Sequence, residues 1–343
     1  MSSVRSVLRP YALAVLLAVG SALVAITVAA VYALPLRDPD GIAGPAYVRL
    51  PSIVVLFVLA DVLPRVLLRR GTALQILRER YAPARMALVA VGLASFYATY
   101  VSYRNLKGAL PFARPRMLDD QLLALDHLMA FGNDPAVLLQ DLLGTGTAAY
   151  VLSAVYLLFL AFVPLSLGAA LVWGRSVRTG SWYVTALCLN WLLGTASYYL
   201  VPSMGPVFVR PQTFIDLPDT GVSALQESLS RARFEVLADP SGADTIAGIA
   251  GFASLHCSIV FTAALIAHKV GLPRIVRWSM WVFLALTMIA TAYFGWHYLV
   301  DDVAGLAIGF VSVLVADRAT RSTPAGVGEP RLPRARRAET IAA

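Results

Sequence analysis

The chain has 343 residues, of which 58% are hydrophobic and only 14% are charged. A soluble domain averages about 45–50% apolar and about 25% charged residues, and here the apolar excess lies in long uncharged blocks. The composition therefore excludes a disordered chain, a disulfide scaffold and an ordinary soluble enzyme. The net charge of +8 bears first on membrane topology, so no nucleic-acid partner is predicted.

The predicted fold is an all-α polytopic membrane protein with about eight transmembrane helices, because a spanning helix needs about 20 mostly apolar residues. The second segment is the weakest of the eight, since prolines and an Asp61–Arg65 pair interrupt it. The predicted spans are Tyr11–Leu34, Leu50–Leu68, Met86–Tyr103, Ala148–Gly174, Trp182–Pro202, Ser254–Val270, Trp278–Gly295 and Tyr298–Ala316.

Lys and Arg are roughly twice as frequent on the N-terminal side of the membrane as on the other side. The positive-inside rule therefore predicts a multi-pass cell-membrane protein with both termini in the cytoplasm. The long loops 104–147 and 203–253 are then extracytoplasmic. Apolar residues at helical spacing in the first of these loops predict an amphipathic helix on the membrane surface. They are Leu118, Leu122, Leu125 and Met129.

Two of the four histidines stand at the extracytoplasmic ends of predicted spans, where a polar residue is a functional hypothesis by default. His297 opens the eighth span, and Asp301, four residues later, faces the same side of the helix. A carboxylate that binds one imidazole nitrogen leaves the other nitrogen free to act as a base or nucleophile.

The second cluster, Ser254 and His256, opens the sixth span. A helix N-terminus with a hydroxyl and an imidazole forms an anion site with an acid beside it. Two spans separate the clusters, so both are predicted on one membrane face. Two other interpretations stay open: histidines that only lie at the membrane interface, and a metal site of two histidines and one carboxylate.

Two further spacings predict contacts between or within helices. Gly305 and Gly309 form a small-xxx-small face that is typical of close packing against a neighbouring helix. Asp61 and Arg65 lie four residues apart, and we expect them to pair in a structural role.

The segments Ser254-Leu-His256 and Thr291-Ala-Tyr293…His297-Tyr-Leu-Val-Asp301 resemble two signature motifs of the type 2 phosphatidic acid phosphatase superfamily. The form is closest to its inositol phosphorylceramide synthase and inositolphosphotransferase-like branch. The resemblance is strong over residues 250–310 and is absent from the first span and the tail.

The resemblance implies a six-helix-type core that transfers phosphate through a histidine nucleophile, without a metal or other cofactor. His297 would attack phosphorus and Asp301 would orient it. His256 would protonate the leaving oxygen and then deprotonate the acceptor. Ser254 and Tyr298 would bind the substrate.

The superfamily's basic residues match less well. Its third motif usually carries an arginine six residues before the histidine, where this chain has Thr291. Its first motif, Lys-x6-Arg-Pro, matches Lys107 and Arg114 in letters, although two extra spans follow. Arg210 stands at the expected topological place but lacks the lysine. All three basic residues are therefore candidates for substrate binding.

The sequence thus predicts an extracytoplasmic active site that moves a phosphoryl unit from a membrane lipid to an alcohol or to water. Inositol-phosphate-type headgroup transfer is favoured; a phosphatase for lipid phosphates or polyprenyl (pyro)phosphates is the alternative, and a non-catalytic transporter is the alternative from another class. Four parts are predicted: a three-helix membrane bundle (1–103), an extracytoplasmic segment (104–147), the catalytic membrane core (148–317) and a disordered basic cytoplasmic tail (318–343).

Overall fold

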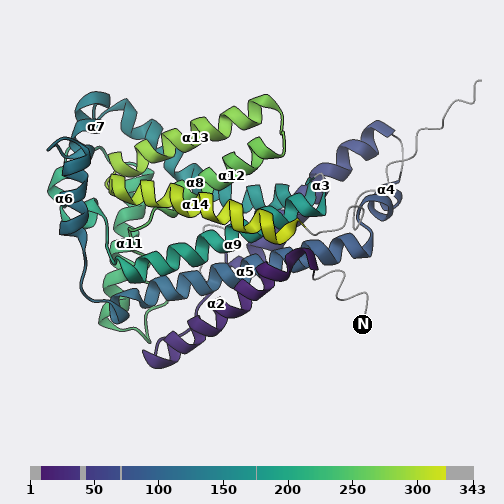
Figure 1. The fold of residues 1–343 in the computed structure, drawn as a ribbon, viewed down its shortest axis with the longest axis horizontal. Coiled ribbons are helices and arrows are strands. Elements are labelled where there is room, and N and C mark those ends of the chain that lie inside the picture. Colours follow the sequence, from purple (N-terminus) through teal and green to yellow (C-terminus); the bar gives the residue numbers. More distant parts are fainter. Residues whose placement is uncertain (1–8, 39–43, 70–71, 175, 322–343) are drawn as a thin grey trace, which may run out of the picture.

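The structure is a computed structural model that describes residues 9–38, 44–69, 72–174 and 176–321, so most of the predicted tail lies outside the described residues. The described chain contains helices and turns but no strand. Long helices run between the two ends of the molecule (Figure 1). They are α2 (Ala12–Val31), α3 (Ala46–Arg69), α5 (Pro83–Ala113), α8 (Thr147–Val172), α9 (Val177–Leu200), α12 (Leu255–Lys269), α13 (Arg274–Tyr293) and α14 (Leu299–Thr320).

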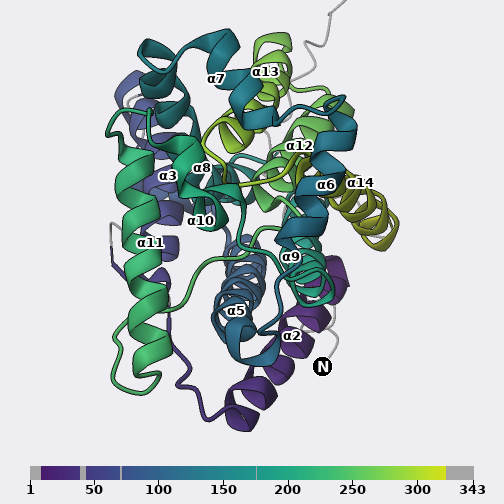
Figure 2. The same ribbon diagram turned by 90° about the vertical axis from the view of Figure 1, so that its left-hand side faces the viewer.

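Short helices close the two ends of this bundle. Figure 2 looks onto the end at which α6, α7, α10 and α11 gather, and Figure 1 shows α4 at the opposite end. These elements are α4 (Ala73–Arg80), α6 (Asp119–Met129), α7 (Pro135–Leu143), α10 (Pro206–Val209) and α11 (Gly221–Ala238), with 3-10 turns η1 (Arg9–Tyr11) and η2 (Pro211–Phe214).

Six of the described helices are long and apolar enough to cross a membrane, which confirms an all-α polytopic membrane protein. These are α2 with its preceding turn, α3, α5, α8, α13 and α14. The predicted fifth and sixth spans form α9 and α12, and α12 has only 15 residues. All eight predicted segments are therefore helical, and six of them qualify as spans by length and composition.

Helix α9 lies in the middle of the bundle, where it contacts α2, α5, α8, α12 and α14. Most of its side chains are buried, including the polar residues Asn190 and Thr195. Asn190 donates its amide to the backbone oxygen of Ala186 at 2.7 Å and to Thr262 Oγ1 of α12 at 3.0 Å. A helix enclosed by other helices can carry such polar groups because they find partners inside the protein.

Helices α12 and α14 pack closely because α14 presents two glycines to α12. A Cβ atom on Gly305 would collide with the backbone oxygen of Ser254, and one on Gly309 would lie 2.7 Å from that of Ser258. The predicted small-residue contact is thus confirmed. It brings the first turns of α12 and α14, which carry the two histidine motifs, against one another.

Helix α5 continues to Ala113, although its predicted apolar span ends at Tyr103. The polar residues beyond Tyr103 end the apolar run but not the helix, because they find partners in the bundle. Asn105 Oδ1 accepts the backbone N–H of Arg37 at 2.9 Å, and the hydroxyl of Tyr199 donates to the backbone oxygen of Leu106 at 2.7 Å. Residues 104–113 thus belong to a bundle helix.

The predicted amphipathic helix forms as α6 and buries Leu122 as predicted, but two acidic residues are buried with it in place of Leu125 and Met129. Leu125 and Met129 are 45% and 43% exposed, whereas Asp119 and Asp126 are only 4% and 3% exposed. Positions seven apart lie on the same face of a helix, and these two carboxylates bind backbone N–H groups of neighbouring segments. Helix α6 therefore packs on α10 and α14 through its acidic side.

Candidate active site

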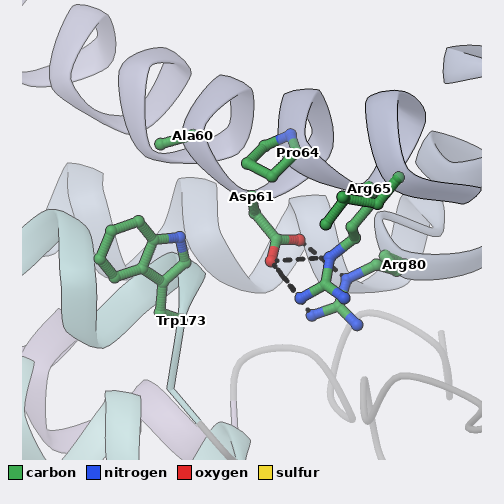
Figure 3. A pocket seen from close by; sticks show the side chains of 7 residues that line it. Ala60, Asp61, Pro64, Arg65, Arg80 and Trp173 are labelled. Carbon is green, nitrogen blue, oxygen red and sulfur yellow. Dashed lines mark hydrogen bonds and ion pairs between the residues drawn. The ribbon is translucent and has the colours of Figure 1, made fainter.

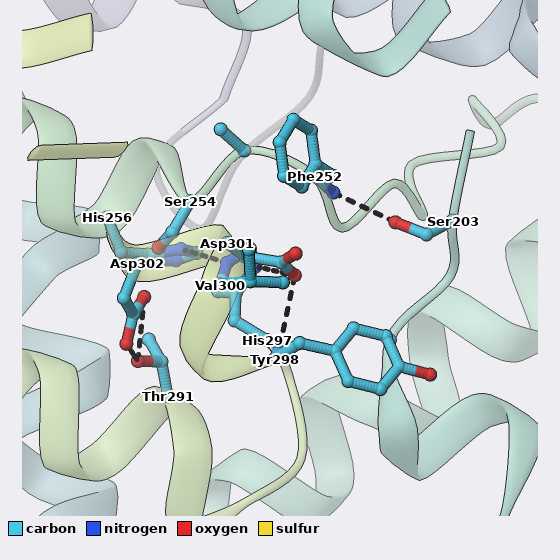
Figure 4. A network of polar contacts seen from close by, with 12 residues as sticks. Ser203, Phe252, Ser254, His256, Thr291, His297, Tyr298, Val300, Asp301 and Asp302 are labelled. Carbon is cyan, nitrogen blue, oxygen red and sulfur yellow. Dashed lines mark hydrogen bonds and ion pairs between the residues drawn. The ribbon is translucent and has the colours of Figure 1, made fainter. Parts of the chain in front are cut away.

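The two predicted histidine clusters meet at the end of the bundle covered by α6 and α7 (Figure 4). His256 Nδ1 lies 3.2 Å from His297 Nε2. The other ring nitrogen of His297, Nδ1, lies 3.3 Å from Asp301 Oδ2. His256 comes from the first turn of α12 and His297 from the turn between α13 and α14, so three polar groups form one connected row.

Backbone contacts hold this row in place. Ser254 caps α12 by accepting the N–H of Cys257 at 3.4 Å, and its own N–H donates to the backbone oxygen of Asp301 at 2.9 Å. The backbone N–H of Tyr298 donates to Asp301 Oδ2 at 3.1 Å. Asp301 is fully buried. When its carboxylate accepts the Nδ1 proton of His297, the lone pair of Nε2 is left free.

The neighbouring Asp302 points to a different set of groups. Its carboxylate accepts from Cys257 Sγ at 2.9 Å and from Thr291 Oγ1 at 3.2 Å. Thr291, which stands where the superfamily usually carries an arginine, therefore binds Asp302 and adds no positive charge to the site. Neighbours on a helix differ in direction by about 100°, which explains the different partners of Asp301 and Asp302.

Aromatic rings from α8 enclose the histidines. The ring centroid of His256 lies 4.8 Å from that of Tyr156 and 4.3 Å from that of Phe159. Trp296 stacks on Tyr156 at 4.9 Å. His297 is only 5% exposed. Burial lowers the pKa of His297 to about 4, and the positive charge of Lys107 acts in the same direction while the negative charge of Asp302 opposes it.

The three predicted phosphate-binding cations differ in their placement. Lys107 of α5 lies within electrostatic range of both histidines, with its Nζ 5.3 Å from the ring centroid of Tyr198. Within the described part of the chain, Lys107 makes no hydrogen bond or ion pair. The Arg114 side chain is exposed at the end of α5 and makes no polar contact with any described side chain. Lys107 is thus the candidate cation that stands free beside the histidines.

Two other predicted substrate-binding residues are engaged with carboxylates. Arg210 Nη2 forms an ion pair with Asp134 Oδ2 at 2.7 Å. The hydroxyl of Tyr298 donates to Asp119 Oδ1 at 3.2 Å. Neither side chain makes a hydrogen bond to a site histidine in the described structure, so contact with a substrate would require these pairs to open.

Three residues that support the site are absent from the predicted set. Ser203 accepts the backbone N–H groups of Gly251 and Phe252, at 2.8 and 2.9 Å, and so anchors the loop before α12. Asp119 accepts the N–H of Gly205 at 3.0 Å. Asp126 accepts the N–H of Leu299 at 2.9 Å and of Val300 at 3.2 Å. The seven-residue spacing of the two aspartates is the signal that points to their shared face.

Asp126 acts as a helix cap supplied by a different helix, because Leu299 and Val300 are the first residues of α14. Asp126→Ala should lower the free energy of unfolding by about 1–2 kcal/mol, the usual range for a lost cap. The thermal unfolding midpoint of the purified protein measures this loss. Asp120→Ala is the matched control, since Asp120 is the exposed neighbour on α6. Equal midpoints for the two variants would contradict the capping role.

The same residues are not grouped as metal ligands. In the described ranges, no group of three or more His, Cys, Asp or Glu is arranged to hold a metal ion. His256 and His297 face each other directly, and Asp301 occupies the remaining nitrogen of His297. The two-histidine, one-carboxylate alternative gains no support from this arrangement.

Comparison with known proteins places this site in a family. A model of the PAP2 superfamily, the type 2 phosphatidic acid phosphatases, matches residues 120–315, which is more than half of the chain. The match contains both histidines, Asp301 and Arg210 but not Lys107 or Arg114. No significant match was found among curated proteins or solved structures. The chain belongs to the PAP2 superfamily and is an enzyme of its lipid phosphatase and phosphotransferase type.

Proposed function

We propose that this enzyme transfers a phospho-headgroup from a membrane phosphodiester lipid to an alcohol, as the inositol phosphorylceramide synthase-like branch does. The observation that carries the proposal is the row formed by His256, His297 and Asp301. It places a nucleophilic nitrogen directly against an acid–base group, the two functions that transfer of a phosphoryl unit requires.

In the proposed first step, His297 Nε2 attacks phosphorus and forms a nitrogen–phosphorus bond. The bond from phosphorus to the lipid oxygen breaks, and protonated His256 gives its proton to that oxygen. In the second step His256 takes the proton of the acceptor hydroxyl, whose oxygen attacks phosphorus and releases His297. The phosphate must part the two rings, because they bond each other in the free protein. Ser254 would bind a phosphoryl oxygen.

Charge supports a phosphodiester donor over a phosphomonoester. A phosphodiester carries one negative charge, whereas a phosphomonoester carries close to two at neutral pH. Among the described residues, Lys107 is the candidate cation whose charge reaches both histidines, and Thr291 supplies none. A site with so little positive charge fits a diester headgroup better than a doubly charged phosphomonoester.

Shielding from water also supports transfer. His297 and Asp301 are buried, and aromatic rings of α8 cover His256. A closed site keeps water away from a reactive phosphohistidine and favours an acceptor that binds in its place. We expect this site to face the extracytoplasmic side, as the distribution of Lys and Arg predicts.

The proposal can be tested with purified, reconstituted protein and a phosphatidylinositol donor that is radiolabelled at phosphorus. A lipid alcohol such as ceramide or diacylglycerol serves as the acceptor, and products are separated and identified by mass. We expect a new labelled phosphodiester lipid that appears only with an acceptor. If labelled phosphatidic acid instead yields free phosphate faster than any phosphodiester reacts, the protein is a phosphatase.

The pH dependence of the reaction should reflect the depressed pKa of His297. The nucleophile must be unprotonated, so activity is lost only below its pKa of about 4. We expect kcat/KM to stay flat between about pH 7 and 5 and to fall about tenfold per unit below pH 4. The leaving group of an aryl phosphodiester donor needs no proton from His256. With such a donor, the fall of kcat/KM at low pH therefore reports the protonation of His297 alone. An acidic limb near 6.5, the ordinary histidine value, would contradict a buried neutral nucleophile.

A further inference from the structure

A charged cavity lies at the end of the bundle where α4 stands, opposite the histidines (Figure 1), and Figure 3 shows its side chains. Its volume is about 500 Å³, within the range of small-ligand sites. Along α5, the 24 residues from Pro83 to Lys107 span about 36 Å, which separates this end from the histidines. The cavity is lined by Ala60, Asp61, Pro64, Arg65, Leu68, Arg80 and Trp173.

The charges in this cavity do not balance. Asp61 accepts from Arg65 Nη2 and from Arg80 Nε, each at 2.8 Å, and from the hydroxyl of Tyr81 at 2.9 Å. The predicted Asp61–Arg65 pair is thus confirmed, but a second arginine joins it. One carboxylate neutralises only one guanidinium, so the cluster keeps a positive charge.

The cavity also has an apolar part on α3. Leu68 lines the cavity beside Arg65 and is 84% exposed, so it joins the cavity to the outer surface of the helix. Trp173 forms the remaining wall and donates its Nε1–H to the backbone oxygen of Phe57 at 3.1 Å. Tryptophan is enriched at membrane interfaces. The cavity therefore joins a cationic base to a surface of α3 that is suited to acyl chains.

We propose that this cavity binds the phosphate of an anionic phospholipid, with an acyl chain against Leu68 of α3. Guanidinium groups match phosphate oxygens in geometry and charge. Basic pockets between membrane helices at the cytoplasmic side are suited to anionic headgroups, and this end is the one predicted to be cytoplasmic. The bound phosphate would compensate the excess positive charge of Asp61, Arg65 and Arg80.

This lipid is not a substrate in the proposal, because the cavity lies a membrane thickness away from His297. Helices α3 and α4 precede the matched region of the superfamily, whereas Trp173 lies inside it. A lipid held between them would join the added N-terminal helices to the family core. The inference therefore stands apart from the proposed reaction, and its test does not depend on turnover.

Native mass spectrometry of the full-length protein tests the proposal, with phosphatidylglycerol and phosphatidylcholine as probes. We expect phosphatidylglycerol to bind in preference to phosphatidylcholine. Arg80→Gln should weaken phosphatidylglycerol binding at least about fivefold, in line with the effect of one lost cation at a lipid surface. Leu68→Glu should weaken it similarly by placing a negative charge at the cavity without removing a buried contact.

Arg178→Gln is the matched control. Arg178 and Arg321 both form ion pairs with Asp317, so this cluster also has two arginines and one aspartate at the same end of the bundle. It is more exposed than the Asp61 cluster, and its residues do not line the cavity. Loss of Arg178 should leave phosphatidylglycerol binding unchanged. The proposal is overturned if Arg178→Gln weakens binding as much as Arg80→Gln, or if Leu68→Glu binds like the wild type. Equal competition by soluble glycerol phosphate would identify a free-phosphate site and overturn the lipid assignment.

Discussion

Replacing His297 with alanine is expected to lower turnover by at least about 10⁴-fold, because no other group can form the proposed nitrogen–phosphorus bond. The ring is held between Asp301 and His256, at 3.3 and 3.2 Å, and a water in the space left by alanine would be a far weaker and less well-placed nucleophile. Initial rates of labelled phosphodiester formation by the reconstituted protein give the size of the loss.

His268→Ala is the matched control for this variant. His268 is exposed at the far end of α12, away from the site, and its loss should change the rate by less than about twofold. Thermal unfolding midpoints close to that of the wild type would show that both variants are folded. Full turnover by a folded His297→Ala protein would refute the histidine mechanism.

The covalent intermediate gives a second measurement on the same step. With an aryl phosphodiester donor the first step needs no acid, whereas the second still needs His256 to take a proton from the acceptor. His256→Ala should therefore accumulate protein labelled at His297, stable to alkali and labile to acid. A variant lacking both histidines should carry no label. Label on the double variant would place the bond on another residue.

The catalytic row could be predicted because its main contacts are local. His297 and Asp301 are four residues apart, and this spacing predicts that their side chains meet. In the structure His297 lies in the turn just before α14, and its Nδ1 contacts Asp301 Oδ2 across the first turn of that helix. Gly305 and Gly309 extend the same argument to the helix pair, since small residues permit the close approach of α12. These inferences require only spacing along the chain.

The supporting residues could not be predicted in the same way, because their partners depend on how distant segments pack. Asp119 and Asp126 look like the solvated side of a surface helix until α6 is placed against α10 and α14. Their carboxylates then become buried caps for backbone N–H groups. The end of α5 was also beyond prediction. Polar residues after Tyr103 end the apolar pattern, but the helix continues because these residues form hydrogen bonds with neighbouring segments.

The position of Lys107 beside the histidines could not be predicted either. Two long helices separate Lys107 from the histidine motifs in the sequence, and three basic residues were candidates for binding phosphate. In the structure α5 packs along α9 and carries Lys107 to the site from outside the matched region of the family. Arg210, which lies inside that region, is paired with Asp134. This arrangement gives the N-terminal helices a proposed catalytic purpose, namely to supply the phosphate-binding cation.

Lys107→Met should therefore lower kcat/KM by about 10²- to 10³-fold, the usual cost of removing one preorganised charge from a developing anionic transition state. Methionine keeps the approximate length of the side chain while removing the charge that lies over the Tyr198 ring, so folding should be preserved. Because the Lys107 charge helps to lower the pKa of His297, the acidic limb of the pH profile should also move upward from about 4. A lysine with a purely structural role would leave that limb in place.

Arg114→Met is the matched control, since Arg114 belongs to the same Lys-x6-Arg-Pro segment but is exposed to solvent, where screening weakens its effect on the site. We expect a change of about twofold or less in kcat/KM and no shift of the acidic limb. If Arg114→Met is the more damaging variant, the cation that binds phosphate comes from the end of α5, and the site must open toward it. If neither variant matters and Arg210→Met does, the Arg210–Asp134 pair opens on substrate binding, and the matched family core holds the phosphate without the added helices.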